Sequence, residues 1–224
     1  PGADQLTISG GLVEHYTGSN EGDTKGGVFW IVGPELFDET GIQPINVNIS
    51  DLTITEGRAI EGGGIFNGPE STLTLEDCTL GPNNQALNFG GGLSNTYGDV
   101  TLNRCTVMGN SASGGEETSC GGGVSLIYGG TMTLINSTIS GNFSDDFGGG
   151  ILVWDGGMME LLHTTINDNT ANAETTNMPW GGGGGIHNEG WGNIHLKNSI
   201  VAGNHDLTTS GIHNPWPDVS GTFN

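Results

Sequence analysis

NSTISGNFSDDFGGGI, residues 136–151, joins two signals that recur along the chain. In its first part an isoleucine stands between polar residues, which is the alternation of a short strand rich in β-branched residues. In its last part three glycines precede an aliphatic residue. Because both signals return at similar distances along the chain, they predict a structural repeat.

Five glycine triplets followed by an aliphatic residue mark the repeat, at 62–65, 90–93, 121–124, 148–151 and 183–186. Each triplet is followed by an apolar pair at alternate positions: Leu73/Leu75, Val100/Leu102, Met132/Leu134, Met159/Leu161 and Ile194/Leu196. A third aliphatic segment follows each pair, at 78–80, 105–107, 137–139, 164–166 and 199–201. The repeat therefore predicts three short strands.

A change of parity between the second and third segments predicts a sharp bend in the chain. The residues at the bend are mostly types that tolerate the left-handed backbone conformation: Asp51, Asp77, Arg104, Asn136, His163 and Asn198. Hairpin turns, which a β-sandwich needs, are missing. We expect an all-β, right-handed parallel β-helix, a pectate-lyase-like solenoid of about seven coils with three strands in each and neighbouring strands about 4.8 Å apart.

The whole chain, residues 1–224, is expected to form this single domain. An irregular first coil spans 5–57, where 52–55 echoes 6–9 after Val28 and Val47 have supplied the other two strands. Regular coils span 62–204. In a partial last coil, 205–224, the segment 211–214 with Ile212 repeats 185–188, and Asp218-Val219 repeats Asp99-Val100.

One asparagine follows the third segment of each repeat. Identical amides that stack in a solenoid satisfy corner main-chain groups and one another, so this column predicts a structural ladder. The expected ladder consists of Asn83, Asn110, Asn142, Asn169 and Asn204.

Composition limits the partners of the chain. Four basic residues against 25 acidic ones give a net charge of −21, which repels phosphate backbones and makes nucleic acid an unsuitable partner. No apolar run is long enough to span a membrane, and no signal peptide begins at Pro1. Cys78 and Cys105 occupy equivalent positions in adjacent coils, where parallel Cβ directions favour buried free thiols over a disulfide.

The glycine triplets and the segment 136–142 resemble the bacterial right-handed β-helix repeats of choice-of-anchor and polymorphic outer-membrane proteins. Residues 1–10, 198–204 and 217–221 are similar to that family as well, so the resemblance covers nearly the whole chain. It implies secretion, display at the cell surface and a β-helical passenger. It does not imply an activity.

A polysaccharide lyase or hydrolase is an alternative, because enzymes of these classes also use the β-helix fold. Their chemistry needs a cationic base or carboxylates clustered on one strand face. The basic residues Lys25, Arg58, Arg104 and Lys197 fall on different coils, and Arg104 is expected to pair with an acidic residue in the same column. We therefore expect no catalytic residue and no enzyme.

Four acidic residues suggest a shallow notch where loops leave the same corner. Asp145 and Asp146 lie in one coil, and Glu116 and Glu117 lie in the loop of the preceding coil. Their oxygen atoms would suit a hard cation such as calcium. The alternative is a solvated acidic surface that holds no cofactor.

Aromatic residues recur shortly after each triplet and are expected to form a stripe down one edge: Tyr97, Tyr128, Trp154, Trp191 and Trp216. Such a stripe packs on itself, binds sugar rings or forms an association surface. These interpretations stay open, and the second makes a carbohydrate-binding surface module the alternative function.

The two ends of the chain lack an evident cap. An unpaired rung exposes main-chain donors and acceptors, so head-to-tail self-association into a filament is expected, unless the chain is a piece of a longer β-helix. We expect an extracellular, cell-surface protein with a structural or adhesive function, whose partners are further copies, a polysaccharide or a cell surface.

Overall fold

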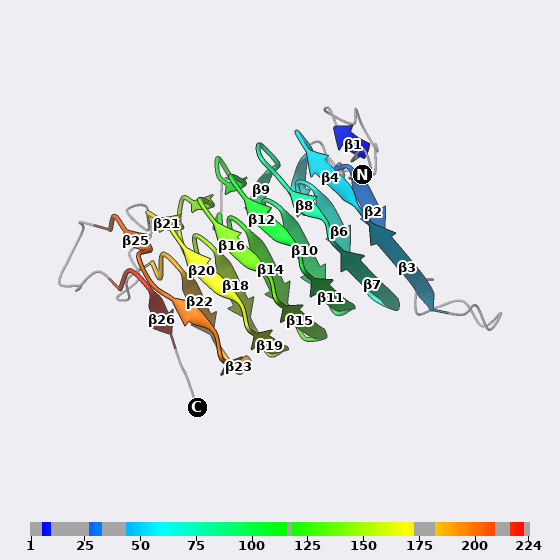
Figure 1. Ribbon diagram of the computed structural model, residues 1–224. Helices are drawn as coiled ribbons and strands as arrows, with labels where there is room; N and C mark the ends of the chain where they lie inside the picture. The colour runs from blue at the N-terminus through cyan, green and yellow to red at the C-terminus, as the bar shows by residue number, and fades with distance from the viewer. Residues whose placement is uncertain are drawn as a thin grey trace, which may run out of the picture.

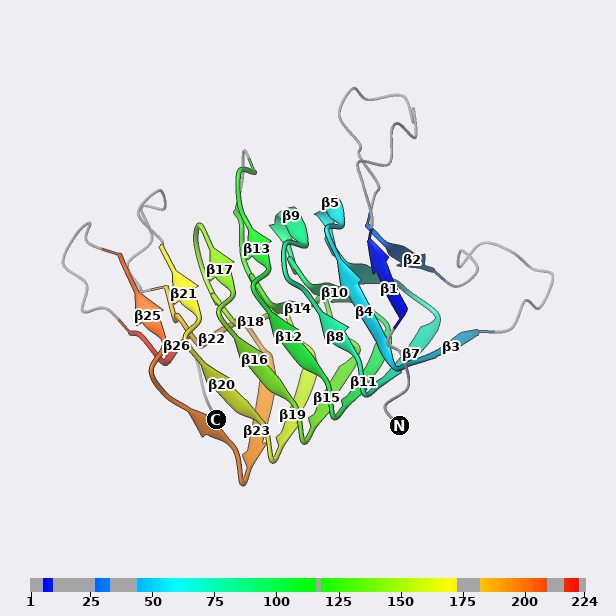
Figure 2. The ribbon, with the colours of Figure 1, turned by 45° about the horizontal axis from the view of Figure 1, so that its top comes forward.

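The computed structural model describes residues 6–9, 27–32, 44–115, 118–172, 182–208 and 216–221, and for residues 6–9 only the backbone is described. Its strands form four parallel sheets that run along one axis (Figures 1 and 2). We call the sheets A to D, with the strands of each given below. The chain visits them in the order C, D, A and B, and one such circuit is a coil. The described residues therefore form a parallel β-solenoid.

Each sheet takes one strand from each coil. Sheet C contains seven strands: β2 (Phe29–Ile31), β6 (Ile65–Asn67), β10 (Leu93–Thr96), β14 (Val124–Ile127), β18 (Ile151–Trp154), β22 (Ile186–Glu189) and β26 (Val219–Gly221). Sheet D contains six strands: β3 (Ile45–Ser50), β7 (Ser71–Glu76), β11 (Asp99–Asn103), β15 (Thr131–Ile135), β19 (Met158–Leu162) and β23 (Asn193–Lys197).

The third predicted segment forms sheet A. It contains seven strands: β1 (Leu6–Ser9), β4 (Leu52–Thr55), β8 (Thr79–Leu80), β12 (Thr106–Met108), β16 (Thr138–Ser140), β20 (Thr165–Asn167) and β24 (Ile200–Val201). Sheet B follows the asparagine column. It contains six strands: β5 (Arg58–Glu61), β9 (Gln85–Phe89), β13 (Ser111–Ala112), β17 (Phe143–Ser144), β21 (Thr170–Ala171) and β25 (His205–Asp206).

The expectation of three strands in each coil is wrong, because sheet B adds a fourth. Its strands are mostly two residues long, and only one side chain in each points inward. That inward residue is small and buried in five successive coils: Ala59, Ala86, Ala112, Ser144 and Ala171. Without an alternating aliphatic pair, this strand has no periodic signal in the sequence.

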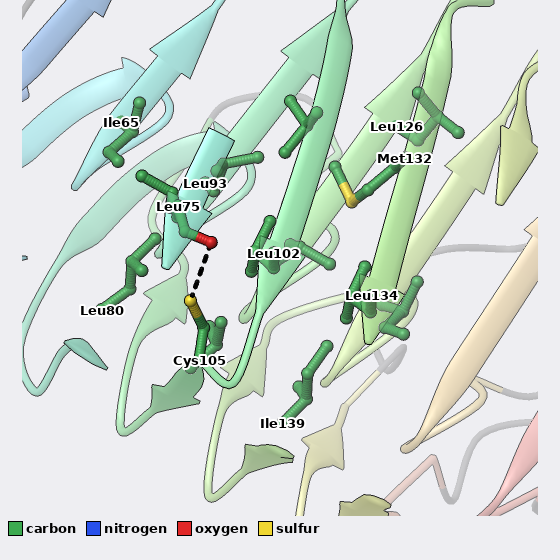
Figure 3. Packing of buried hydrophobic residues seen from close by; sticks show 14 of the residues in the cluster. Ile65, Leu75, Leu80, Leu93, Leu102, Cys105, Leu126, Met132, Leu134 and Ile139 are labelled. Atoms are coloured by element: carbon green, nitrogen blue, oxygen red, sulfur yellow. Dashed lines mark hydrogen bonds between the residues drawn. The ribbon is translucent and has the colours of Figure 1, made fainter. Parts of the chain in front are cut away.

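The predicted alignment of the apolar pairs is confirmed by the strand register. Leu75, Leu102, Leu134 and Leu161 are partners on successive strands of sheet D, and all four are fully buried. Figure 3 shows Leu75, Leu102 and Leu134 inside the solenoid together with aliphatic side chains of sheets C and A, among them Leu93 and Ile139. Burial of this continuous core is the main force that holds the coils together.

The predicted bend lies between sheets D and A. All six residues of the column Asp51, Asp77, Arg104, Asn136, His163 and Asn198 have φ between 51° and 56°. The parity change in the sequence is therefore produced by one left-handed residue in each coil.

The irregular first coil also follows the predicted register in two places. Leu6 pairs with Leu52 on sheet A, and Val47 pairs with Leu73 on sheet D. The last coil differs from the prediction, because Val219 pairs with Ile186 on sheet C and therefore does not repeat Val100. Ile212 lies outside the described residues.

Candidate functional site

The predicted asparagine ladder lies inside the corner between sheets A and B. Four of its predicted members are buried: Asn110, Asn142, Asn169 and Asn204. The side-chain Nδ2 of each of the first three donates to Oδ1 of the asparagine in the next coil at 2.9–3.0 Å. Each Nδ2 also donates to a main-chain carbonyl of the preceding coil, as from Asn142 to Val107 at 3.0 Å. The ladder is confirmed for these four positions, and its amides are used within the fold.

The fifth predicted ladder residue, Asn83, is wrong, because Asn84 takes its place. Asn84 is fully buried and its Nδ2 donates to Asn110 Oδ1 at 2.9 Å, whereas Asn83 is exposed and has φ of 68°. The corner that contains Gly81 and Pro82 has one residue more than the corners of the following coils. The ladder therefore begins one residue later in this coil.

The ladder ends differently on its two sides. At the first coil, Asn84 Oδ1 accepts a hydrogen bond from the main-chain nitrogen of Gly57 at 2.9 Å. At the last coil, Asp218 Oδ1 accepts hydrogen bonds from the main-chain nitrogen and the Nδ2 of Asn204 at 3.1 and 3.0 Å. A carboxylate therefore completes the row of amides.

The third glycine of each triplet makes room for the ladder. At Gly123 a Cβ atom would lie 2.6 Å from the carbonyl oxygen of Gly150 and 3.0 Å from Asn142 Nδ2. The equivalent positions Gly92, Gly150 and Gly185 are equally close to the next coil and to an asparagine amide. The glycine triplet and the asparagine column are therefore two parts of one corner.

A second internal column contains the thiols. Cys78 and Cys105 lie in line with Ser137, Thr164 and Ser199, and all five donate to main-chain carbonyls at the bend. The three cysteines of the chain are free and buried. The hydrogen bond with Cys78, together with burial, raises the pKa of the Cys105 thiol, and burial raises the pKa of the Cys120 thiol. These thiols have a structural role here.

The predicted ion pair in the bend column is present. Arg104 Nε and Nη2 lie 2.8 Å from Asp77 Oδ1 and Oδ2, and Nη2 also donates to Glu76 Oε1 at 2.5 Å. The Arg104 guanidinium holds the pKa of the Asp77 carboxyl below its usual range. Because all three side chains are exposed, the arrangement is a surface ladder contact.

The predicted aromatic stripe is formed only by Tyr97 and Tyr128. Their rings stack with centroids 5.8 Å apart and planes at 23°, and the residues are 58% and 45% exposed. Trp154 lies one position before this column and packs against Phe89, at a centroid distance of 5.4 Å. In the coil after that of Trp154 the tyrosine column is occupied by Gly190, and Trp191, which is 84% exposed, lies one position after it.

Trp216 does not belong to the stripe either. It precedes β26, at the opposite end of the sheet C strand from the tyrosines, and its main-chain nitrogen donates to Asp206 Oδ2 at 2.9 Å. The predicted stripe residues therefore divide into the exposed tyrosine pair, two exposed tryptophans outside it, Trp191 and Trp216, and Trp154, which packs against Phe89.

The predicted acidic notch is not assembled by the described residues. Asp145 Oδ2 accepts from the main-chain nitrogen of Gly114 at 2.8 Å, and Asp146 Oδ2 accepts from that of Ser119 at 2.6 Å. Both carboxylates thus fix the loop between β13 and β14. Glu116 and Glu117 lie outside the described residues, and the rest of the described chain contains no group of three metal-ligating side chains.

A second apolar cluster on the outer face of sheet C was not predicted. It contains Phe89, Cys120, Ile127, Phe147 and Leu152, with Trp154 packed against it. The sequence signal was available, because three of these residues stand directly before a glycine triplet. The sharp turn of the triplet brings them over the strand that follows.

His187 lies beside this cluster in a polar arrangement. Its ring stacks on Phe147 at 4.7 Å, its Nδ1 lies 2.6 Å from Ser220 Oγ, and its Nε2 lies 3.5 Å from Glu189 Oε2. The residue types match a nucleophile, a base and a carboxylate. His187 and Ser220 are each only 1% exposed, however, so no substrate reaches the hydroxyl in this structure.

Comparison with known proteins gives one match. The family described as right handed beta helix region matches residues 43–214, which is more than half of the chain. No curated protein and no solved structure matches the sequence. Among the residues that the structure describes, none lies in a helix long and apolar enough to cross a membrane.

Proposed function

The chain belongs to the right-handed β-helix region family, and from this premise we propose that it is an extracellular structural and adhesive solenoid. The observation that carries the proposal is the placement of the repeated polar side chains. The asparagine ladder and the column of Cys78, Cys105 and their counterparts hydrogen-bond inside the corners. These repeated polar side chains therefore stabilise the fold, and the outer faces of the four sheets are the regular surfaces that can contact a partner.

The charge of the chain supports a role in surface contact. A net charge of −21 repels other acidic molecules. Adhesion therefore uses the parts of the outer surface that carry little charge, and it gains strength when many copies act together.

A bead assay tests the adhesive function. Beads coated with the chain are compared with beads coated with an unrelated protein of equal negative charge, under flow over polysaccharide films and isolated cell envelopes. We expect retention above the control on at least one of these surfaces. Equal retention of both bead types on every surface would exclude adhesion.

Enzymatic cleavage of polysaccharides is the less favoured alternative. The described carboxylates Asp145 and Asp146 bind loop amides, and His187 and Ser220 are buried. Reducing-end release from neutral and acidic polysaccharides measures this alternative directly. Turnover by the purified chain would replace adhesion by catalysis as its function.

A carbohydrate-binding module is the second candidate, and the Tyr97 and Tyr128 stack favours it. Exposed aromatic rings offer apolar faces to the C–H groups of sugars. A glycan array with the double variant Tyr97→Ala and Tyr128→Ala tests it. Signals that persist in the variant would assign glycan binding to another surface.

Head-to-tail association into a filament remains part of the proposal. Leu196 on β23 is 44% exposed, although its partner Leu161 one coil below is fully buried, so this rung accepts a further one. Sheets A and C have seven described strands, but sheets B and D have six. If two copies stack so that their end strands pair in sheets A and C, a gap of one strand is left between the copies in sheets B and D. Electron microscopy of the concentrated chain tests association, and single particles without filaments would oppose it.

A further inference from the structure

The outer face of sheet A carries a straight row of threonines. Thr53, Thr79, Thr106, Thr138 and Thr165 are register partners on β4, β8, β12, β16 and β20. Figure 2 shows these strands side by side along the solenoid. Because neighbouring strands lie about 4.8 Å apart, the row presents one hydroxyl and one methyl group at that interval. We call these five residues the threonine row.

The hydroxyls of the threonine row are not used by the fold. The main-chain nitrogens of Thr106, Thr138 and Thr165 donate to carbonyl oxygens of the preceding coil, but within the described part of the chain no hydrogen bond joins a side-chain hydroxyl of the five to another residue. Other hydroxyls differ, because Ser137 and Thr164 donate to main-chain carbonyls and Thr131 donates to Asp99 Oδ1 at 2.6 Å. The row therefore keeps five free donors and acceptors in register.

The same face is free of charge. The second outward position on these strands is held by Thr55, Met108, Ser140 and Asn167, so the described outer face of sheet A has no acidic or basic side chain. Charged residues lie at its borders, as at Asp77 and Asp168. In a chain with a net charge of −21, a neutral face selects a neutral partner, since anionic ones are repelled by the rest of the surface.

The size of the face argues against a protein partner. The five strands lie about 4.8 Å apart and are mostly three residues long, at about 3.3 Å per residue, so their face covers roughly 200 Å². A stable protein interface buries about 800 Å² on each partner. A polymer chain that lies along the row needs only a narrow track and adds one set of contacts for every coil it crosses.

We propose that the outer face of sheet A binds a neutral polysaccharide, whose extended chain of hydroxyl-bearing sugars lies along the threonine row. The threonine hydroxyls exchange hydrogen bonds with sugar hydroxyls, and the methyl groups contact sugar C–H groups. This inference rests on the proposed adhesive function and names its partner.

Cosedimentation with insoluble polysaccharides tests the proposal. The probes are microcrystalline cellulose, chitin and insoluble mannan, with cross-linked polygalacturonate as the acidic comparison. The double variant Thr106→Val and Thr138→Val removes two hydroxyls but keeps side-chain shape and strand preference. The matched control, Thr101→Val and Thr133→Val, makes the same change on the outer face of sheet D.

We expect the native chain to sediment with at least one neutral polysaccharide and not with polygalacturonate. The affinity of the sheet A variant for the polysaccharide is expected to be at least roughly tenfold lower than that of the native chain, because two hydrogen bonds are lost. The sheet D control is expected to bind as the native chain does. Urea unfolding of both variants verifies that they are folded.

Three outcomes overturn the assignment: no sedimentation with any neutral polysaccharide, preferential binding of polygalacturonate, or equal losses in the sheet A and sheet D variants. The bead assay separates this failure from that of the proposed function. If beads coated with the sheet A variant adhere as well as native beads, adhesion stands and the threonine row is not its site. If native beads do not adhere at all, the adhesive function itself fails.

Discussion

Replacing Asn84 by alanine tests the hydrogen-bond ladder at the position where the sequence is ambiguous. Asn84 Oδ1 accepts from the main-chain nitrogen of Gly57, and its Nδ2 donates to Asn110 Oδ1 and to the carbonyl oxygen of Ile54, each at 2.9 Å. The Ile54 carbonyl keeps a second donor, the main-chain nitrogen of Gly81 at 2.7 Å. Alanine therefore leaves two buried groups without the partner they have here, the Gly57 N–H and Asn110 Oδ1.

The expected cost follows from these two groups. A buried donor or acceptor that loses its partner costs about 1–3 kcal/mol, so Asn84→Ala should lower the free energy of unfolding by about 3 kcal/mol. For a chain of this length each kcal/mol shifts Tm by roughly 2–4 °C, which predicts a decrease of roughly 6–12 °C. Urea unfolding followed by circular dichroism measures the free energy, and thermal unfolding measures Tm.

Asn83→Gly is the matched control. Asn83 is exposed, and its φ of 68° suits glycine, so this change should alter stability by less than about 0.5 kcal/mol. Hydrogen exchange adds a local readout, because the Gly57 amide should lose protection in the Asn84 variant only. If the two variants have equal stability, or if Asn83→Gly is the more harmful, the ladder does not run through Asn84 and the reasoning is refuted.

Three further predictions concern the corners. Gly123→Ala places a Cβ atom 2.6 Å from a main-chain oxygen and should cost about 3 kcal/mol, whereas Gly203→Ala, with no atom within 4 Å and φ of 75°, should cost about 1 kcal/mol in the same urea experiment. Arg104→Ala should raise the pKa of Asp77 toward its usual value in a carboxyl NMR titration. Because that pKa is depressed in the folded state, the stability that Asp77 contributes at neutral pH is lost as the pH falls through the folded pKa, and this acid-dependent loss should shrink in the variant; an unchanged pKa would contradict it. All three cysteines should resist a thiol reagent in the folded chain and react once it is unfolded, so fast labelling of the native protein would contradict their burial.

The parts of the fold that the sequence predicts are those with a periodic apolar signal. The stacked leucines of sheet D and the left-handed residue at the bend are both visible as patterns in the sequence. Inward positions are occupied by aliphatic residues because they are buried, and the bend is occupied by residue types that tolerate a positive φ. The strands of sheet B contribute one small residue such as Ala112, which carries no such pattern. The strand number was therefore underestimated.

The candidate surfaces are predicted less well, for two physical reasons. Counting along one coil places a residue in a column only if no corner changes length, and the longer corner before Asn84 shifts the ladder by one position. A shift of one residue also reverses the direction of a strand side chain, so Trp154 points over the outer face of sheet C while Tyr97 and Tyr128 stack at the corner. The threonine row was within reach of the sequence, because Thr79, Thr106 and Thr138 hold the middle position of the aligned third segments; only the structure shows that their hydroxyls have no hydrogen-bond partner within the described residues.

The constant geometry of the asparagine ladder has a consequence for how such chains diversify. Successive ladder residues are separated by 26, 32, 27 and 35 positions, yet their side-chain contacts stay at 2.9–3.0 Å. Chain length is thus uncoupled from axial rise, because successive ladder residues meet at the same distance whatever the number of residues between them. Insertions between sheets B and C, where β13 and β21 are followed by longer connections than β9 and β17 are, are the natural places to add an epitope or a binding loop.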